Sequence, residues 1–440
     1  MSKIKTIYVC QKCEYQSQKW IGKCPQCDAW NSFAEDYIGG DESRKTASSK
    51  IQGKARDVME YRKVIEGLSE KNSRTATGID ELDRVLGSGI VDGSLILLSG
   101  EPGIGKSTLT LQICDAISAK NKKVLYISGE ESESQIGLRG KRLGLVLDNV
   151  SLITENSLES IAATIEAEEP KFVIIDSIQV VFSENLNGSA GTVSQVRYCT
   201  EALMEIAKHK KISMLIVGHV TKEGNLAGPR ALEHLVDVVL FLEGERNHDF
   251  RILRGIKNRF GSTNEVGVFE MYEGGLRELK NPSQRFLEER QKKSPGSTVV
   301  CTVEGTRPFM VEVQALTSTT RFGYPRRTSS GFDSNRLQLL IAVLERHLGL
   351  NLGTQDVYVN VVGGMQLNEP ACDLGVCLAI ISSLKKKTLP PDFVAIGEVG
   401  LIGEIRKVPQ LEKRLKEAER LGFETTFKKS LKEYYQLLFS

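Results

Sequence analysis

The sequence predicts an α/β protein whose core is a mainly parallel sheet, preceded by a small cysteine-rich module and followed by a separate C-terminal domain. In the core, apolar runs typical of strands alternate with segments of helical periodicity. The runs fall at residues 94–99, 124–128, 172–176, 212–218, 236–242 and 250–256. Such alternation favours a parallel sheet with helices on both faces. A glycine-rich turn follows the first run, and two closely spaced cysteine pairs precede the core.

The glycine-rich turn, GEPGIGKST at residues 100–108, matches the phosphate-binding motif G-x-x-x-x-G-K-[ST]. A strand-like run precedes it and a helical segment follows, which is the context that this P-loop requires. We expect Lys106 to reach the β- and γ-phosphates of ATP or ADP, and Ser107 to ligate Mg²⁺. The expected nucleotide-binding residues are Gly100, Glu101, Pro102, Gly103, Ile104, Gly105, Lys106, Ser107 and Thr108.

Length and composition exclude several classes of protein. At 440 residues the chain is long enough for about three domains. Its formal net charge of +2 is nearly neutral, so a nucleic-acid surface would have to be a local patch. No apolar run approaches the ~18 residues of a membrane span, and the N-terminal segment does not resemble a signal peptide. We therefore expect a cytoplasmic protein with no membrane partner.

Four cysteines near the N-terminus predict a zinc ribbon. Cys10 and Cys13 form one C-x2-C pair, Cys24 and Cys27 form another, and the spacing suits tetrahedral all-sulfur ligation of Zn²⁺. A module of about thirty residues cannot fold on its own core, so metal binding would supply the folding free energy. The other five cysteines lie in apolar stretches and are expected in the core: Cys114, Cys199, Cys301, Cys372 and Cys377.

The predicted organisation has five segments. A zinc ribbon occupies residues 1–36, an ATPase core residues 59–285 and a C-terminal domain residues 298–440. Residues 37–58 are expected to be a flexible linker, because they are rich in Gly, Ser and Lys and contain few apolar residues. Residues 286–297 are expected to join the core to the C-terminal domain.

Carboxylates follow two strand-like runs of the core. Asp176 ends the run at residues 172–176 and is expected to hold the Mg²⁺ shell, as in a Walker B element. Glu130 and Glu131 follow the run at residues 124–128. A carboxylate there can polarise the attacking water, so we predict Glu130 as the base and keep Glu131 as the alternative.

Polar residues also follow the next strand-like runs. His219 comes at the end of the run at residues 212–218, where it is expected to sense the γ-phosphate and signal to the loop at residues 223–230. The polar stretch at residues 183–195 is a second long loop on the expected nucleotide face, and the two loops together suggest the lining of a channel. Further along, strict alternation would place Arg251 and Lys257 on one face of a strand and Arg254 on the other.

The ribbon, the P-loop and four further motifs together resemble one family, the bacterial RadA (Sms) DNA repair proteins. The motifs are SGEES at residues 128–132, GHVTKEG at 218–224, AGPRALEH at 227–234 and KNRFG at 257–261. The resemblance covers essentially the whole chain. The ATPase core also resembles those of RecA and of DnaB-type replicative helicases.

This resemblance implies a homohexameric ring that binds single-stranded DNA in its channel, translocates with ATP and promotes branch migration in DNA repair. The implied partners are single-stranded and branched DNA and a RecA-type recombinase. Lys257 and Arg259 would reach the neighbouring subunit's ATP site, where a cation supplied in trans stabilises transition-state charge. The residues expected at DNA are Lys222, Arg230, Lys257, Asn258, Arg259, Phe260 and Gly261.

Residues 298–440 resemble the α+β proteolytic domain of Lon, through GEVGLIGEI at residues 397–405. Lon uses a Ser-Lys dyad. Here Cys372 or Asp373 stands where the serine would be, and the counterpart of the lysine falls on Glu412. Amide hydrolysis by this mechanism is therefore not expected, and no cation or base is implied beside Cys372. We expect a scaffold that helps to form the ring.

Two questions stay open from the sequence. Arg321, Arg326, Arg327 and the lysines at residues 385–387 either bind duplex phosphates or form a solvated charged face. The whole chain has two alternative functions: a KaiC-like regulatory ATPase without translocation, and an ATP-dependent protease, which the missing dyad opposes.

Overall fold

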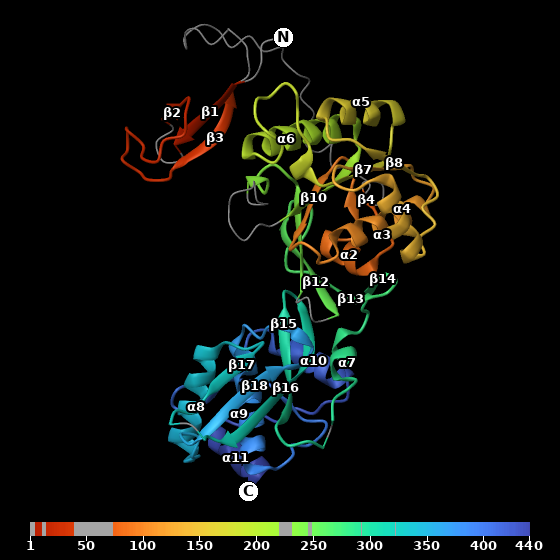
Figure 1. Ribbon diagram of the computed structural model, residues 1–440. Helices are drawn as coiled ribbons and strands as arrows, with labels where there is room; N and C mark the ends of the chain where they lie inside the picture. Colours follow the sequence, from red (N-terminus) through yellow and green to blue (C-terminus); the bar gives the residue numbers. More distant parts are fainter. Residues whose placement is uncertain are drawn as a thin grey trace, which may run out of the picture. The chain divides into compact units, whose positions relative to one another are not determined.

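The computed structural model describes residues 5–10, 15–38, 74–219, 231–244, 249–291, 293–321 and 323–440 (Figure 1). The chain divides into two compact units. The first comprises Met1–Glu243, Ile252–Thr263 and Met271–Glu278, and the second comprises Gly244–Arg251, Asn264–Glu270 and Leu279–Ser440. The predicted boundaries after residues 36, 58, 285 and 297 remain predictions. Most of the 37–58 linker lies outside the described residues.

A three-stranded antiparallel sheet forms the N-terminal ribbon, in the order β2-β1-β3. Its strands are β1 (Lys5–Cys10), β2 (Gln16–Ser17) and β3 (Phe33–Ile38). Its core is very small, since Cys10, Cys24 and Phe33 are buried there with Tyr8 and Ile21 packed around them. So little apolar burial cannot offset the entropy of ordering the segment, which makes metal binding the expected source of stability.

A nine-stranded sheet contains the parallel strands of the first unit, in the order β14-β13-β12-β11-β6-β10-β9-β7-β8. The parallel strands are β6 (Leu95–Gly100), β7 (Val124–Ser128), β8 (Val150–Thr154), β9 (Phe172–Asp176), β10 (Ser213–His219) and β11 (Val238–Glu243). The antiparallel side holds β12 (Phe250–Asn258), then β13 (Val266–Tyr272) and β14 (Gly275–Glu278). Every predicted strand run coincides with one of these strands, so the predicted fold class is confirmed.

Helices cover both faces of this sheet, which explains why β6, β7 and β9 are buried at every position. One face packs against α5 (Leu158–Glu168) and α6 (Val193–Lys210), where Ile161 and Leu203 join alternate strand residues in one cluster. The intervening strand residues face the other way, as Tyr126 interacts there with Thr110 of α3 (Lys106–Ser118). The shorter helices α2 (Asp80–Leu86) and α4 (Glu133–Leu143) complete the layer, and β4 (Arg74–Thr75) pairs with β5 (Ile90–Val91).

The prediction that Lys257 and Arg254 lie on opposite faces of their strand is wrong. Val239 of β11 pairs with Lys257 of β12, but the next residue, Leu240, pairs with Gly255. Ile256 is therefore an extra residue, a β-bulge, which reverses the alternation of side chains. As a result Arg254 and Lys257 share a face. Arg254 forms an ion pair with Glu243 on that face.

The second unit is a five-stranded mixed sheet packed against helices, in the order β17-β18-β16-β15-β19. The strands are β15 (Ser297–Glu304), β16 (Arg307–Thr319), β17 (Arg327–Ser330), β18 (Gln355–Val361) and β19 (Val394–Ala395). The helices are α7 (Pro282–Leu287), α8 (Ser334–Leu348), α9 (Asp373–Lys385), α10 (Leu411–Arg420) and α11 (Leu431–Phe439). The helix α9 is almost entirely buried, from Asp373 to Ser382, and so forms the centre of this unit.

A small hairpin of β20 (Glu398–Val399) and β21 (Ile405–Arg406) lies within the segment that resembles Lon. That resemblance remains a prediction.

Among the helices of the described residues, none combines the length and the apolar character needed to cross a membrane.

Candidate nucleotide site and metal centre

Four neighbouring strands of the nine-stranded sheet bring the predicted site residues to one edge. In the order β6-β10-β9-β7, all four run parallel, so their carboxyl ends meet at the same edge. His219 pairs in register with Gly100, where the P-loop begins, and Asp176 pairs with Ser128, two residues before Glu130. Lys106, Asp176, Glu130 and His219 are therefore neighbours in space.

Glycines shape the P-loop. Gly100 has φ 157°, and a Cβ there would lie 2.4 Å from the carbonyl oxygen of Leu242. Gly105 has φ 114° and forms the N-cap of α3, a backbone conformation that side chains rarely adopt. The loop thus turns tightly and delivers the N-terminus of a thirteen-residue helix to the sheet edge. A helix N-terminus attracts anions, because its first N–H groups are unpaired and its dipole is positive there.

Lys106 is a buried cation at this helix start, with only 4% of its surface exposed. Its ammonium donates hydrogen bonds of 2.9 Å to the carbonyl oxygens of Gly100 and Glu101. Burial lowers the pKa of Lys106, while the charges of Asp176 and Glu130 act in the opposite direction. A buried ammonium hydrogen-bonded to neutral carbonyls, beside a helix N-terminus, fits the phosphate groups of a nucleotide.

Asp176 ends β9 and is 9% exposed. Tyr126, from the adjacent strand β7, donates a hydrogen bond of 2.8 Å to its carboxylate. Burial raises the pKa of Asp176, and the hydroxyls of Ser107 and Tyr126 oppose that rise. The hydroxyl of Ser107 and the carboxylate of Asp176 are oxygen ligands of the kind that Mg²⁺ prefers, so the pair fits the predicted magnesium site.

Glu130 is held in its ionised form. The Ser177 hydroxyl donates a short hydrogen bond to its Oε1, and Nε2 of His219 lies 3.5 Å from the same oxygen. The interaction with His219 is the largest cause, and burial opposes it, but the pKa of Glu130 still falls to about 2. Lys106 contributes to the same lowering. The carboxylate is therefore ionised at the P-loop edge throughout the physiological pH range, where it can accept hydrogen bonds.

Glu131, the alternative base, is engaged elsewhere. Its Oε1 accepts a hydrogen bond from Arg139 of α4 at 2.5 Å. Its backbone N–H donates to the hydroxyl of Ser128 at 3.1 Å. Of the two adjacent carboxylates, Glu130 faces Lys106 and His219, whereas Glu131 anchors the start of α4. The geometry thus favours Glu130 for water activation.

His219 has one nitrogen toward Glu130 and another that remains available. Its Nδ1 is buried and has no hydrogen-bond partner among the described residues. Such an atom normally has a partner in a folded protein, which fits a role for His219 toward a bound group. Residues 220–230 follow directly and lie outside the described part of the chain, and with them the predicted DNA contacts Lys222 and Arg230.

The residues of the KNRFG motif lie away from the carboxyl ends of the parallel strands, where the P-loop begins. Val239 pairs with both Lys257 of β12 and Leu97 of β6, so Lys257 is level with the first half of β6. Its ammonium donates to the carbonyl oxygens of Glu233 and Val236, which precede β11. From Leu97 to Gly100 the strand rises about 10 Å, and the Lys257 side chain points the other way. Lys257 cannot reach the P-loop of its own subunit.

The rest of this motif is held by side chains and carbonyls of the first unit. Arg259 forms an ion pair of 3.2 Å with the buried Asp237. Asn258 donates to the carbonyl oxygens of Val85 and Leu86, both at 3.3 Å, and accepts from the N–H of Phe260 at 2.9 Å. Gly261 lies beside the backbone of Gly87, and a Cβ at this position would come within 3.2 Å of the side-chain nitrogen of Asn258.

The loop at residues 183–195 is compact in the structure. Gln195, fully buried, accepts from the N–H of Ser183 and donates to the carbonyl oxygens of Ser183, Leu186 and Gly188. Glu159 accepts from Ser183 and Asn185. One glutamine amide thus organises most of the loop. Its role as a channel lining remains a prediction.

Two residues make contacts in the site that the sequence did not predict. Ser177 directly follows Asp176 and turns back to Glu130, and Tyr126 lies in the middle of β7 but reaches Asp176. The position of Ser177 next to the Walker B carboxylate was a usable signal. Tyr126 gave none, because its contact depends on which face of β7 is turned to α3.

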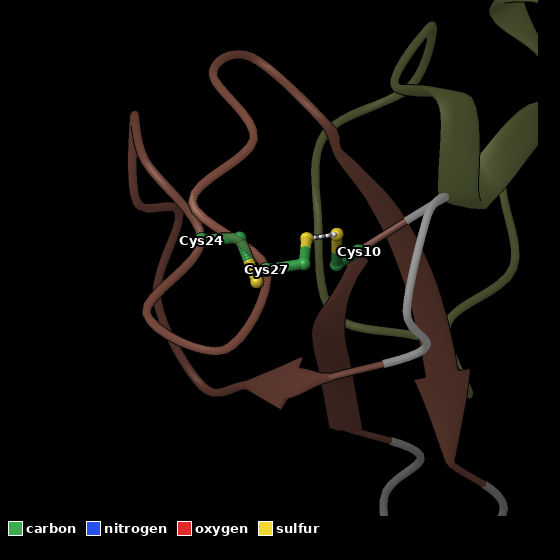
Figure 2. A group of neighbouring side chains, drawn as sticks. All are labelled: Cys10, Cys24 and Cys27. Carbon is green, nitrogen blue, oxygen red and sulfur yellow. Dashed lines mark hydrogen bonds between the residues drawn. The ribbon is translucent and has the colours of Figure 1, made fainter.

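The ribbon cysteines converge as a zinc site requires. The sulfur atoms of Cys10, Cys24 and Cys27 all lie within 4.8 Å of one another, with Cys10 and Cys27 at 3.6 Å (Figure 2). With Zn–S bonds of about 2.3 Å, a tetrahedral site places its sulfurs about 3.8 Å apart, so the donor set fits Zn²⁺. Cys13, the fourth predicted ligand, lies outside the described residues.

The second unit does not hold a nucleophile at the positions that would carry one. Cys372 is completely buried, and burial raises the pKa of its thiol well above the ordinary value. Asp373 is also buried and pairs with Arg336. Contrary to expectation, a cation does lie near Cys372, namely Arg414, but it forms an ion pair with Glu369. Glu412 is exposed. The buried charged groups are thus paired with one another, and Cys372 offers no thiolate that could act as a nucleophile.

Three of the cationic residues considered above have partners within this unit. Arg327 donates to the carbonyl oxygens of Leu352 and Gln355. Lys387 donates to Ser440 at 3.1 Å, and Lys385 lies 5.8 Å from the ring centre of Tyr435. These contacts favour a structural role for the three residues over binding of duplex phosphates.

Fold and site geometry together define a P-loop ATPase core that follows a zinc ribbon. In agreement, residues 68–225 match the family model described as AAA domain, and residues 8–35 match that described as Rubredoxin metal binding domain. The chain is 50% identical over 423 residues to the DNA repair protein RadA of Bacillus subtilis (strain 168), covering 96% of this chain and 92% of that protein. The RadA of Streptococcus pyogenes serotype M1 is 52% identical with the same coverage. The chain belongs to the RadA family of DNA repair proteins.

Replacing Cys10 and Cys24 with Ala is expected to abolish zinc binding, because two of the ligands are lost and the ribbon has almost no core of its own. Elemental analysis of the purified full chain should show about one equivalent of zinc in the wild type and none in the double variant. Hydrogen exchange should show loss of protection in β1 and β3 and no change in β6 or β10. As a control, replacing Cys114 and Cys199, which lie in the core, with Ala should leave the zinc content unchanged. A wild type without zinc would contradict the assignment.

Proposed function

We propose that this protein is a DNA-dependent ATPase motor that binds single-stranded DNA and promotes branch migration of recombination intermediates. The observation that supports it most is the convergence of Lys106, Asp176, Glu130 and His219 at one sheet edge. A buried cation, a carboxylate beside a hydroxyl and an ionised base are the groups that phosphoryl transfer to water needs.

In the proposed reaction each residue has one task. The P-loop N–H groups and Lys106 hold the β- and γ-phosphates of ATP, and Ser107 and Asp176 hold Mg²⁺. When bound, Mg²⁺ neutralises charge on the phosphate oxygens. Glu130, kept ionised by His219 and Ser177, orients the attacking water and accepts its proton. His219, which contacts Glu130 and directly precedes residues 220–230, couples the state of the site to that segment.

The DNA part of the proposal rests on family membership. The relatives are named DNA repair proteins, and a motor that acts on DNA needs its ATP site coupled to a DNA-binding loop. The segment after His219 contains Lys222 and Arg230, and we propose these two residues as backbone contacts. Branched DNA and a RecA-type recombinase are the proposed partners.

We further propose a homohexameric ring in which Lys257 and Arg259 serve the ATP site of the neighbouring subunit. The position of Lys257 at the edge away from its own P-loop supports a trans role. In a ring of identical subunits, a cation at one edge of the sheet can meet the nucleotide held at the opposite edge of the next subunit.

Measuring ATP turnover with and without single-stranded DNA, together with branch migration on a synthetic four-strand junction, tests the proposed motor. We expect DNA to stimulate turnover several-fold and ATP to be required for migration. Lys106→Ala should lose both activities, because the phosphate contacts are lost, while Lys171→Ala, at an exposed position, should retain them. A rate of ATP turnover that does not change when DNA is added would favour a regulatory ATPase instead. Digestion of casein in the presence of ATP would favour an ATP-dependent protease.

Mixing two inactive variants tests the proposed role of Lys257. Lys257→Ala should bind nucleotide normally and fail to hydrolyse it. Lys106→Ala should also fail to hydrolyse it, because its phosphate contacts are lost. Mixed rings contain interfaces with an intact P-loop on one side and an intact Lys257 on the other, so some hydrolysis should return. Subunit exchange is checked in parallel by energy transfer between labelled chains. Near-normal turnover of Lys257→Ala alone would mean that this lysine is only structural.

A further inference from the structure

A short 3-10 helix, η1 (Ile178–Val180), begins two residues after the Walker B carboxylate that ends β9. Because β9 lies between β10 and β7 in the sheet, η1 follows it between the ends of those two strands. A Cβ on Gly129 would lie 2.2 Å from Cγ2 of Val180, and a Cβ on Gly218 would lie 3.7 Å from Nε2 of Gln179. These glycines directly precede the proposed base and the histidine that contacts it.

The side chain of Gln179 is a polar link from η1 to the end of β10. Its Nε2 donates a hydrogen bond of 3.4 Å to the backbone carbonyl oxygen of His219, which is longer than the usual range of about 2.7–3.2 Å. Its Oε1 is buried and, like Nδ1 of His219, has no hydrogen-bond partner among the described residues. Since a protonated imidazole nitrogen can donate to an amide oxygen, a shift of β10 that brought these two atoms together would satisfy both.

Two other glutamines of the first unit show what a structural amide looks like. Gln195 uses its oxygen and its nitrogen in four hydrogen bonds within its own loop. Gln112 accepts from the N–H of Leu276 at 3.1 Å and donates to its carbonyl oxygen at 2.8 Å. Within the described part of the chain, Gln179 instead makes one long hydrogen bond and leaves its oxygen unsatisfied. Buried polar atoms normally have a partner, so this difference favours a group that changes partners between states of the site.

The hydrogen bond of Gln179 also joins the starts of two segments that the sequence predicts as the lining of a channel. On one side, η1 leads into the loop at residues 183–195, and the N–H of Phe182 between them donates to the carbonyl oxygen of Asn156 at 2.9 Å. On the other side, the end of β10 directly precedes residues 220–230, which contain the proposed DNA contacts. A change in either segment can therefore reach this amide.

We infer that Gln179 is a positioning residue that transmits DNA binding to the ATP site. Its amide sets the position of the His219 backbone, and thereby the contact of 3.5 Å between the His219 ring and Glu130. The inference rests on the proposed DNA-dependent turnover of ATP. Gln179 takes no part in the chemical step, so its loss should affect the stimulation by DNA and not the basal rate of hydrolysis.

Replacing Gln179 with Met tests this role, because Met keeps the length of the side chain and its packing on Gly218 but removes the hydrogen-bonding groups. Without DNA, we expect ATP turnover within about threefold of the wild type, while stimulation by a single-stranded oligo-dT should disappear. Gln179→Ala should behave in the same way. Gln338→Ala, at an exposed position of α8, is the matched control and should be stimulated like the wild type.

The affinity for the same oligo-dT gives a second readout that a merely structural residue would not move. Without nucleotide, Gln179→Met should bind the oligonucleotide as the wild type does. In the wild type a non-hydrolysable ATP analogue should change that affinity, because coupling between two sites is reciprocal. In Gln179→Met the analogue should have no effect on it.

Retention of at least half of the wild-type stimulation by Gln179→Met would overturn the inference, because the hydrogen bonds would then be dispensable. An equal loss of basal and stimulated turnover would also overturn it, since the side chain would then serve the chemistry or the fold. Failure of the proposed function gives a different pattern, in which the wild type itself is not stimulated by DNA.

Discussion

The first unit depends on one electrostatic arrangement, in which the buried ammonium of Lys106 faces the carboxylates of Asp176 and Glu130. Each of these charges would be costly to bury alone. Together they compensate, since Lys106 lowers the pKa of Glu130 and both acids oppose the fall in the pKa of Lys106. Parallel strands make this possible, because they end at one edge of the sheet and can bring residues far apart in sequence within a few ångströms.

The same arrangement explains why the site is poised for anions. Within the described part of the chain, the ammonium donates hydrogen bonds to carbonyl oxygens of its own loop, and a helix N-terminus adds to the positive potential there. His219 and Ser177 fix the carboxylate of Glu130 on the other side. A buried cation and two carboxylates thus lie at one edge of the sheet, where the proposed nucleotide would bind. Such preorganised charges lower the barrier for a reaction that develops charge.

The second unit contains an ion pair whose arginine is buried, close to Cys372. Arg414 has 1% of its side chain exposed and donates to both carboxylate oxygens of Glu369 and to the carbonyl oxygen of Cys301. Breaking such a pair by removing one partner typically costs about 3–5 kcal/mol. The arginine therefore has a structural reason to be there. Burial and the negative charge of Glu369 raise the pKa of the Cys372 thiol and keep it protonated, while Arg414 opposes that rise.

The sequence was sufficient for the features that depend on local pattern. The alternation of apolar runs predicted the parallel strands, the P-loop motif located the start of α3, and the cysteine spacing identified the ribbon, whose Cys10, Cys24 and Cys27 converge as expected. Features that depend on long-range register were not accessible. The bulge at Ile256 reversed the predicted face of Lys257, and nothing in a single strand's sequence specifies where its partner slips by one residue.

Glu130 and Glu131 also show this limit, because two adjacent carboxylates in one motif are equivalent until their partners are known. The structure separates them, with Glu130 toward Lys106 and His219 and Glu131 toward Arg139. The most direct measurement is the ATP turnover and ATP affinity of Glu130→Gln and Glu131→Gln, which change the charge of either residue with little change in shape. The account predicts that Glu130→Gln binds ATP but loses about a hundredfold or more of its turnover, while Glu131→Gln stays within a few-fold of the wild type. Normal turnover in Glu130→Gln would contradict it.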